Sequence, residues 1–169
     1  MLWYALLIAA VAVERIAELV VSQRNLAWSR LRGGVEFGAG HYPALVVLHT
    51  ALLAGCLLEA VFLHRPFLPA LGWPMLAVVL AAQGLRWWCI TTLGHQWNTR
   101  VVVIPDALRV TGGPYRFVSH PNYVAVVLEG VALPLVHTAW ITALTFTALN
   151  AALLTTRIKV ENEALARLR

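Results

Sequence analysis

Charged side chains are scarce in this sequence, and Lys159 is its single lysine. Only 12% of the 169 residues are charged, 60% are hydrophobic, and the mean hydropathy is +0.72. A water-soluble domain carries roughly 25% charged residues. This composition excludes an ordinary soluble domain and indicates a protein that lies in a membrane.

Basic patches and paired cysteines are also missing. The net charge is +5, but the basic residues lie between apolar blocks and form no lysine-rich arm, so no nucleic-acid partner is expected. The two cysteines, Cys56 and Cys89, lie inside apolar blocks without the spacing of metal ligands. We therefore expect two buried thiols, no disulfide and no metal site.

What the sequence does have is five apolar blocks, each expected to form a helix that crosses the bilayer, which needs about 20 residues. The fold predicted is an all-α integral membrane bundle with spans at residues 2–21, 43–63, 71–93, 122–136 and 139–156. Only a short connection near His137 and Thr138 separates the last two blocks, so these should form a helical hairpin.

Some polar residues fall inside these blocks. Arg15 and Glu18 are three residues apart and can pair on one helical face, either near the headgroups or as part of a site. Glu129 and Asn150 are expected to bond across the hairpin.

Arginine placement predicts the orientation, because short cytoplasmic loops are rich in Arg and Lys. With the N-terminus outside, the outer turns hold only Arg65. The inner segments then hold the remaining loop and tail cations, namely Arg24, Arg30, Arg32, Arg100, Arg109, Arg116, Arg157, Lys159, Arg167 and Arg169. Residues 94–121 and 157–169 are thus predicted to be cytoplasmic, and the membrane is expected to be a bacterial inner membrane.

Two polar motifs flank the predicted hairpin and should meet at its cytoplasmic end. The first is GGPYRFVSHPNY, residues 112–123, where Ser119 is a good N-cap residue and Pro121 suits the first turn of a helix. Such a helix start favours an anionic ligand.

The second motif is RIKVEN, residues 157–162, with Arg157 and Glu161 one turn apart on one face. Facing His120, Asn122 and Tyr123, this pair could bind a zwitterionic ligand. Alternatively, Arg157 and Glu161 form only a surface ion pair, and His120 only caps the helix.

In their order and spacing these motifs resemble the isoprenylcysteine carboxyl methyltransferase family, which has a GxYRxxRHPxY-like motif and a late RxxxEE motif around a terminal hairpin. GPYRFVSHPNY and RIKVENEAL carry the likeness, which covers residue 94 to the C-terminus. Upstream, ELVVSQRNLAWSRLRGGVEFGAGHYP and LGHQWNTRVVVIP resemble a short bacterial subgroup. Asn162 replaces the family's second Glu, and no GxxYxxY tail follows, so a prenylcysteine acceptor is less expected than methyl transfer itself.

The resemblance implies S-adenosylmethionine as the cofactor, with contacts from His120, Pro121 and Tyr123 and with Arg157 and Glu161 completing the site. By its chemistry Arg157 suits the cofactor's carboxylate, and Glu161 suits its ammonium or ribose. Tyr115 or Tyr123 could cover the adenine or the sulfonium, and Asn122 lies beside them in the sequence.

A further polar cluster, His95, Asn98 and Arg100 with Trp97, is expected to line the acceptor side. Trp97 could instead belong to an interfacial aromatic belt with Trp87 and Trp88. A carboxylate acceptor needs no base, whereas a phenol or enol would gain from one.

The resemblance therefore implies a membrane methyltransferase whose lipophilic acceptor arrives from the bilayer. For the bacterial subgroup the preferred acceptor is a phenolic or pyrone polyketide lipid, and an isoprenylcysteine-type carboxylate is the next choice. A phospholipid amine N-methyltransferase and a non-enzymatic multispan protein remain alternatives. Small residues such as Gly55, Gly84 and Gly130 could support helix contacts within one chain or between chains, but an oligomer is not indicated.

Overall fold

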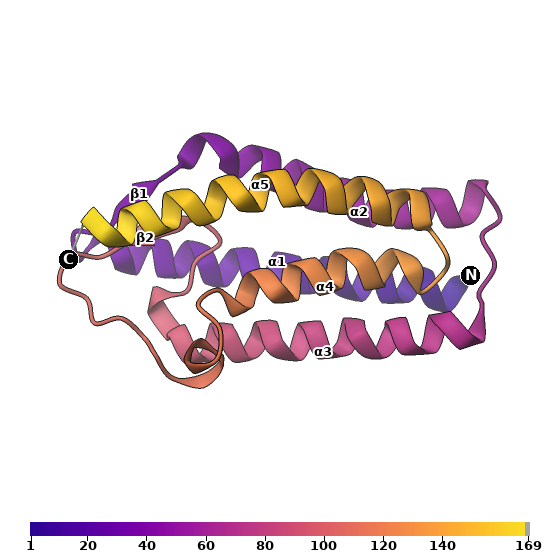
Figure 1. The fold of residues 1–169 in the computed structure, drawn as a ribbon, viewed down its shortest axis with the longest axis horizontal. Coiled ribbons are helices and arrows are strands. Elements are labelled where there is room, and N and C mark those ends of the chain that lie inside the picture. Colours follow the sequence, from indigo (N-terminus) through magenta and orange to yellow (C-terminus); the bar gives the residue numbers. More distant parts are fainter. Residues whose placement is uncertain (168–169) are drawn as a thin grey trace.

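The computed structural model describes residues 1–167 as a bundle of five helices with a small antiparallel ribbon at one end (Figure 1). The elements are α1 (Leu2–Arg30), β1 (Val35–Phe37), α2 (Tyr42–Phe62), α3 (Pro69–Leu93), β2 (Val101–Val103), α4 (Pro121–Leu135) and α5 (Trp140–Arg167), with short 3-10 turns at Ala39–His41, Gly94–Gln96 and Gly113–Arg116. The all-α bundle is thereby confirmed. Of the predicted cytoplasmic cations, Arg169 and the side chain of Arg167 lie outside the described part of the chain.

The helices run alternately up and down, so the two ends of the bundle differ. The N-terminus lies at one end with the α2–α3 and α4–α5 turns (Figure 1). The other end, which we call the ribbon end, carries β1, β2 and the C-terminal part of α5 (Figure 1).

Three stretches are long and apolar enough to cross a bilayer, Ala39–Phe62, Pro69–Gln96 and Trp140–Ala166, which makes this an integral membrane protein. The helix α4 is apolar but has only 15 residues. The helix α1 has 29 residues and carries Arg15 and two carboxylates in its middle. That α1 and α4 also span the membrane stays a prediction.

The first helix is longer than predicted. We expected a polar loop after residue 21, but α1 continues to Arg30 with Ser22, Asn25 and Ser29 buried on one face. The Asn25 amide donates to the carbonyls of Gly94 and Trp97, at 3.0 and 2.7 Å. The loop prediction was wrong because the segment that follows α3 satisfies the side chains of Ser22 and Asn25.

The ribbon joins two connections that are distant in sequence. Val35 lies opposite Val103, and Phe37 lies opposite Val101. This pairing of two distant segments was not predicted from the sequence. Arg100 fastens the ribbon to α2, because its guanidinium donates to Glu36 at 2.6 Å and lies 4.2 Å from the centre of the Tyr42 ring.

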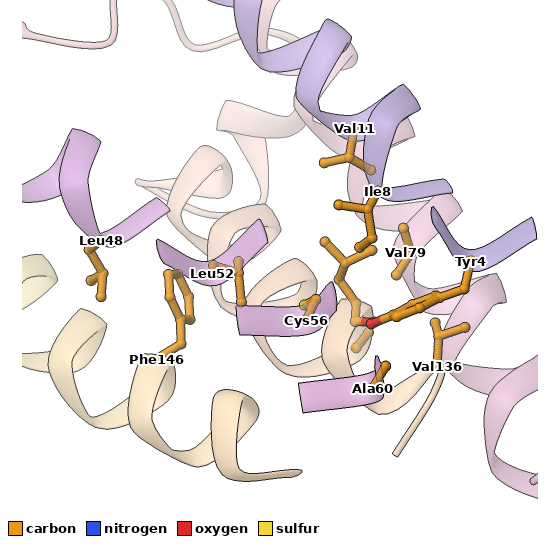
Figure 2. Close-up of a cluster of buried hydrophobic side chains, with 12 residues drawn as sticks. Tyr4, Ile8, Val11, Leu48, Leu52, Cys56, Ala60, Val79, Val136 and Phe146 are labelled. Carbon is orange, nitrogen blue, oxygen red and sulfur yellow. The ribbon is translucent and has the colours of Figure 1, made fainter. Parts of the chain in front are cut away.

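Tight apolar packing fills the half of the bundle away from the ribbon (Figure 2). There Tyr4, Ile8 and Val11 of α1 pack against side chains from the other four helices. The Tyr4 hydroxyl donates to the carbonyl of Leu133 at 3.0 Å. Cys56 belongs to this core, and both cysteines are buried as predicted.

The predicted hairpin of α4 and α5 is confirmed. Gly130 of α4 allows it to close, since a Cβ there would lie 2.1 Å from the Phe146 ring of α5. Glu59 of α2 accepts the Thr142 N–H at 2.7 Å and the Ile141 N–H at 3.2 Å, and it also pairs with Arg65. A carboxylate at the start of α5 stabilises that helix end.

Candidate active site

Two cavities lie in the ribbon half of the bundle and share a wall. The polar cavity, of about 120 Å³, is bordered by β2, by the 3-10 turns Gly94–Gln96 and Gly113–Arg116, and by the facing parts of α4 and α5. The apolar cavity, of about 340 Å³, lies among α1, α2, α4 and α5, with Arg86 of α3 also in its lining. The shared wall consists of the residues that line both cavities: Trp97, Asn122, Tyr123 and Arg157.

The start of α4 carries the first sequence motif into this wall. Ser119 was expected to cap the helix, but the N-cap residue is His120 and its side chain makes no capping hydrogen bond. The prediction was one residue off because Pro121 occupies the first helical position, where its fixed φ sets the start. Pro121 is buried and lines neither of the two cavities, so it acts on the site by positioning its neighbours.

The hydroxyl of Tyr123 joins the two motifs. It donates to the Glu161 carboxylate and accepts a hydrogen bond from Arg157 Nε at 2.9 Å. Arg157 Nη2 also donates to the Thr99 carbonyl at 2.5 Å. Among residues 1–167, Arg157 and Glu161 form no direct ion pair, because the tyrosine hydroxyl lies between them.

His120 is held on the other side of the same carboxylate. Its Nδ1 lies 3.5 Å from Glu161 Oε1, and its ring stacks on Tyr123 with 5.4 Å between centres. The hydrogen bond to Glu161 raises the pKa of His120 above its usual value, against the opposing effect of burial. His120 is therefore placed to pair with the Glu161 carboxylate when its ring is protonated.

Asn122 and Tyr115 complete the polar cavity. Asn122 lines both cavities, and within the described chain its buried Oδ1 has no hydrogen-bond partner. Tyr115 comes from the 3-10 turn Gly113–Arg116 and lines the polar cavity. The Tyr123 ring stacks on His120 and lies 5.8 Å from the Arg157 guanidinium, and Tyr115 and Trp97 are further aromatic side chains that line this cavity.

The polar cluster predicted to line the acceptor side does not lie in one place in the structure. Asn98 and Arg100 line the polar cavity, and Asn98 Oδ1 accepts the Ser22 hydroxyl at 2.8 Å. His95 is exposed, lies on Trp28 with 5.1 Å between ring centres, and lines neither cavity. Trp97 is only 2% exposed, so the interfacial-belt interpretation is wrong for it.

Trp87 and Trp88 differ from Trp97 in this respect. Both are exposed on the outer surface of α3, as residues of an interfacial belt would be.

A buried ionic network forms the inner end of the apolar cavity. Arg15 donates to Glu18 at 2.7 Å, the pair that the sequence predicted, and to Glu129 at 3.0 Å. Arg86 donates to the same Glu129, and its Nε lies 3.4 Å from Glu18 Oε1. The prediction that Glu129 bonds across the hairpin was therefore wrong, because its partners come from α1 and α3.

Arg86 and Asn150 are two further buried polar side chains. Sequence reasoning missed Arg86, although an arginine inside the apolar block at residues 71–93 is a signal of its own. Asn150 is 2% exposed, and its Oδ1 finds no partner within residues 1–167.

The sequence pattern of the isoprenylcysteine carboxyl methyltransferase (ICMT) family matches residues 75–167, which include both motifs of the shared wall. The chain belongs to this family. ICMT proteins are membrane methyltransferases, so the resemblance seen in the sequence is confirmed at that level.

Two full-length relatives accompany this match. An uncharacterized Bacillus subtilis protein, YpbQ, is 37% identical over 166 residues, covering 98% of this chain and 96% of its own. An uncharacterized Haemophilus influenzae protein is 25% identical over 171 residues, covering 99% and 98%. No solved structure matches this ICMT chain.

Proposed function

We propose that this protein transfers a methyl group from S-adenosylmethionine, bound in the polar cavity, to a lipid-like acceptor in the apolar cavity. The observation that carries the proposal is the shared wall, which separates two cavities of opposite character by single side chains such as Asn122 and Tyr123. In-line displacement needs donor and acceptor aligned across a boundary that excludes water.

The polar cavity offers the groups that this cofactor requires. Arg157 and Arg100 are cations for its carboxylate, and Glu161 is an anion for its ammonium or ribose. The unpartnered Oδ1 of Asn122 can accept a further hydrogen bond. When bound, the cofactor supplies a methyl group on a cationic sulfur.

The protein's own residues then position the bound cofactor and shield it from water. Thr99 and Tyr123 hold the Arg157 guanidinium from two sides, so little side-chain entropy remains to be lost when it binds an anion. Buried Trp97 closes the wall against water.

Access from the bilayer supports a lipophilic acceptor. Ile16 of α1 and Val46 of α2 line the apolar cavity and yet are 62% and 40% exposed on the outside of the bundle. A lipophilic molecule can therefore enter the apolar cavity from the bilayer, between α1 and α2, without passing through water. We propose a phenolic or pyrone lipid as the acceptor, with an isoprenylcysteine-type carboxylate and a phospholipid amine as the competing classes.

Charge placement supports a cytoplasmic ribbon end. Arg100, Arg109 and Arg116 lie in the α3–α4 connection there, whereas the α2–α3 turn at the opposite end carries Arg65. A soluble cofactor would then reach the polar cavity from the cytoplasm.

Binding of S-adenosylmethionine to the purified protein in detergent tests the cofactor. We expect Asn122→Ala to weaken binding at least tenfold, whereas Thr155→Ala, which removes an exposed hydroxyl bonded within its own helix, should bind like wild type. No binding by folded wild-type protein would reject the proposal. Transfer of a labelled methyl group to extracted bacterial lipids identifies the acceptor class. Label found only on phospholipid amines would reject the phenolic acceptor in favour of the phospholipid amine.

A further inference from the structure

We infer that Ser22 of α1 is a positioning residue of the cofactor site, which acts through Asn98 and Thr99 to hold Arg157 for the cofactor's carboxylate. The inference rests on the proposed function and extends the site to a further helix, since none of the side chains described for α1 lines the polar cavity. Ser22 also lies outside residues 75–167, the part of the chain that matches the family pattern.

The hydroxyl of Ser22 is buried and its hydrogen-bonding capacity is fully used. Ser22 is 3% exposed. Its Oγ lies 2.8 Å from Asn98 Oδ1, 2.7 Å from Thr99 Oγ1 and 3.1 Å from the Thr99 backbone nitrogen. A hydroxyl has one donor and two acceptor positions, so these three bonds satisfy it completely. Ser22 therefore fixes two successive residues of the segment between α3 and β2.

The directions of these bonds follow from the backbone. Asn98 Oδ1 also accepts the Arg100 N–H at 2.9 Å, and a backbone N–H can only donate. The Ser22 proton therefore goes to Asn98 Oδ1, so the Thr99 hydroxyl must donate to Ser22 Oγ. The Asn98 amide is held on its other side as well, because its Nδ2 donates to the Ser22 carbonyl at 3.2 Å. A flipped amide would set donor against donor at Arg100, so this arrangement allows one orientation of Asn98.

This chain of hydrogen bonds ends on the peptide group that holds Arg157. The Arg100 N–H and the Thr99 C=O belong to one planar peptide group. Asn98 binds this group at its N–H, and the carbonyl on the opposite edge accepts Arg157 Nη2 at 2.5 Å. Rotation of the peptide plane would turn the carbonyl away from the guanidinium. Through Asn98, Ser22 thus controls one of the two hydrogen bonds that residues 1–167 make with the guanidinium, the other being the bond to Tyr123.

Arg157 needs this support because it is a buried cation. It is 8% exposed and lines both cavities. Within residues 1–167 its two hydrogen-bond partners are a hydroxyl and a carbonyl, and neither carries a negative charge. A buried cation without a counter-ion is costly, and a bound carboxylate removes that cost. A guanidinium that is already held in place loses little side-chain entropy on binding, so its position is reflected directly in the affinity for an anionic group.

Two ligands that differ in one carboxylate test the inference: S-adenosylmethionine and decarboxylated S-adenosylmethionine. Both carry the sulfonium, the ammonium and the adenosine. We expect Ser22→Ala to lower the affinity for S-adenosylmethionine about fivefold, the size of one hydrogen bond, and to leave the affinity for the decarboxylated form unchanged. Equilibrium binding to the purified protein in detergent measures both affinities. An equal loss for the two ligands, which a purely structural role of Ser22 would give, overturns the inference.

A double-mutant cycle tests whether Ser22 acts through Arg157. Arg157→Met removes the charge and keeps a long side chain, and in this background Ser22→Ala should cause no further loss of S-adenosylmethionine binding. Additive losses would contradict the inference. Ser29→Ala is the matched control, because Ser29 is equally buried on the same face of α1 and its hydroxyl makes no hydrogen bond within residues 1–167. This variant should bind both ligands like wild type.

A second variant keeps the test decisive should Ser22→Ala unfold. Ser22→Cys nearly preserves the side-chain volume and replaces the hydroxyl by a weakly hydrogen-bonding thiol. It should show a smaller loss than the alanine variant, again for S-adenosylmethionine alone. Unchanged binding in the folded cysteine variant together with unchanged binding in folded Ser22→Ala rejects the inference.

These measurements also separate the inference from the proposed function. Wild-type protein that binds neither ligand would reject the proposed function and the role of Ser22 with it. Wild-type protein that binds S-adenosylmethionine, with the same affinity in folded Ser22→Ala, would keep the cofactor site and reject the role of Ser22 alone.

Discussion

At the end of the bundle opposite the ribbon, the Tyr4 hydroxyl bonds to a backbone carbonyl inside the apolar core (Figure 2), and Glu59 accepts hydrogen bonds from the backbone at the start of α5. At the ribbon end, the Tyr123 hydroxyl donates to Glu161 and accepts a hydrogen bond from Arg157, beside the polar cavity that all three side chains line. The same two residue types thus hold helices together in one region and shape a binding wall in the other. The far end stabilises the bundle, and the ribbon end is open for ligands.

Removing the charge of Glu161 should give the largest functional effect. Glu161→Gln loses the anion of the polar cavity and the ion pair with His120. Because such a change misplaces both ligand and wall, we expect methyl transfer to fall about 100-fold, measured as kcat/KM for S-adenosylmethionine. Wild-type kcat/KM in this variant would remove Glu161 from the cofactor site.

The same change at the far end is the matched control. Glu59→Gln weakens the hydrogen bonds from the Ile141 and Thr142 N–H groups that start α5, and also the bond from Arg65. Hydrogen bonds to a charged group contribute about 1.5–3 kcal/mol each, so we expect a loss of about 2 kcal/mol in unfolding free energy. Denaturation in a fixed detergent measures it. Methyl transfer by the folded fraction of this variant should be unchanged. A loss of turnover in folded Glu59→Gln would contradict the assignment of a purely structural role to this end of the bundle.

Helix existence and helix length were not equally predictable. Apolar blocks of about 20 residues predict the helices, because length and hydropathy are local properties. The extension of α1 through Ser22 and Asn25 was not predictable, since the loop carbonyls that satisfy Asn25 lie about seventy residues away in the sequence. The partner of β2 was missed for the same reason.

In the candidate site, too, contacts between residues distant in the sequence were predicted only in part. The motifs predicted which residues meet, because the hairpin brings its two ends together. They did not predict that the Tyr123 hydroxyl lies between Arg157 and Glu161, which depends on the packing of α4 against α5. The spacing of Arg15 and Glu18 predicted their pair, whereas Arg86 and Glu129 join them from other helices.

A pair of tyrosine variants sharpens the comparison with smaller effects. Tyr123→Phe removes the hydroxyl between Arg157 and Glu161, and we expect kcat/KM to fall about tenfold, since one charge-assisted hydrogen bond is lost on each side. Tyr4→Phe removes one bond to Leu133 and should cost about 1 kcal/mol of stability with transfer unchanged. Thermal unfolding and a transfer assay on both variants measure the two effects. A loss of methyl transfer in Tyr4→Phe together with unchanged transfer in Tyr123→Phe would contradict the roles assigned to the two ends of the bundle.

The smallest effect concerns pH and belongs to the ribbon end alone. Glu161 raises the pKa of His120, so the protonated ring stabilises the folded state. That contribution is fully present below the unfolded pKa of about 6.5 and is lost as pH rises through the higher folded value. For a partly exposed pair it should amount to no more than about 1 kcal/mol. Unfolding measured from pH 5.5 to 9 should show this loss in wild type and not in His120→Asn, whereas Glu59→Gln should keep the wild-type slope. A slope that persists without the imidazole would assign the pH dependence to another group and leave His120 as a stacking partner of Tyr123.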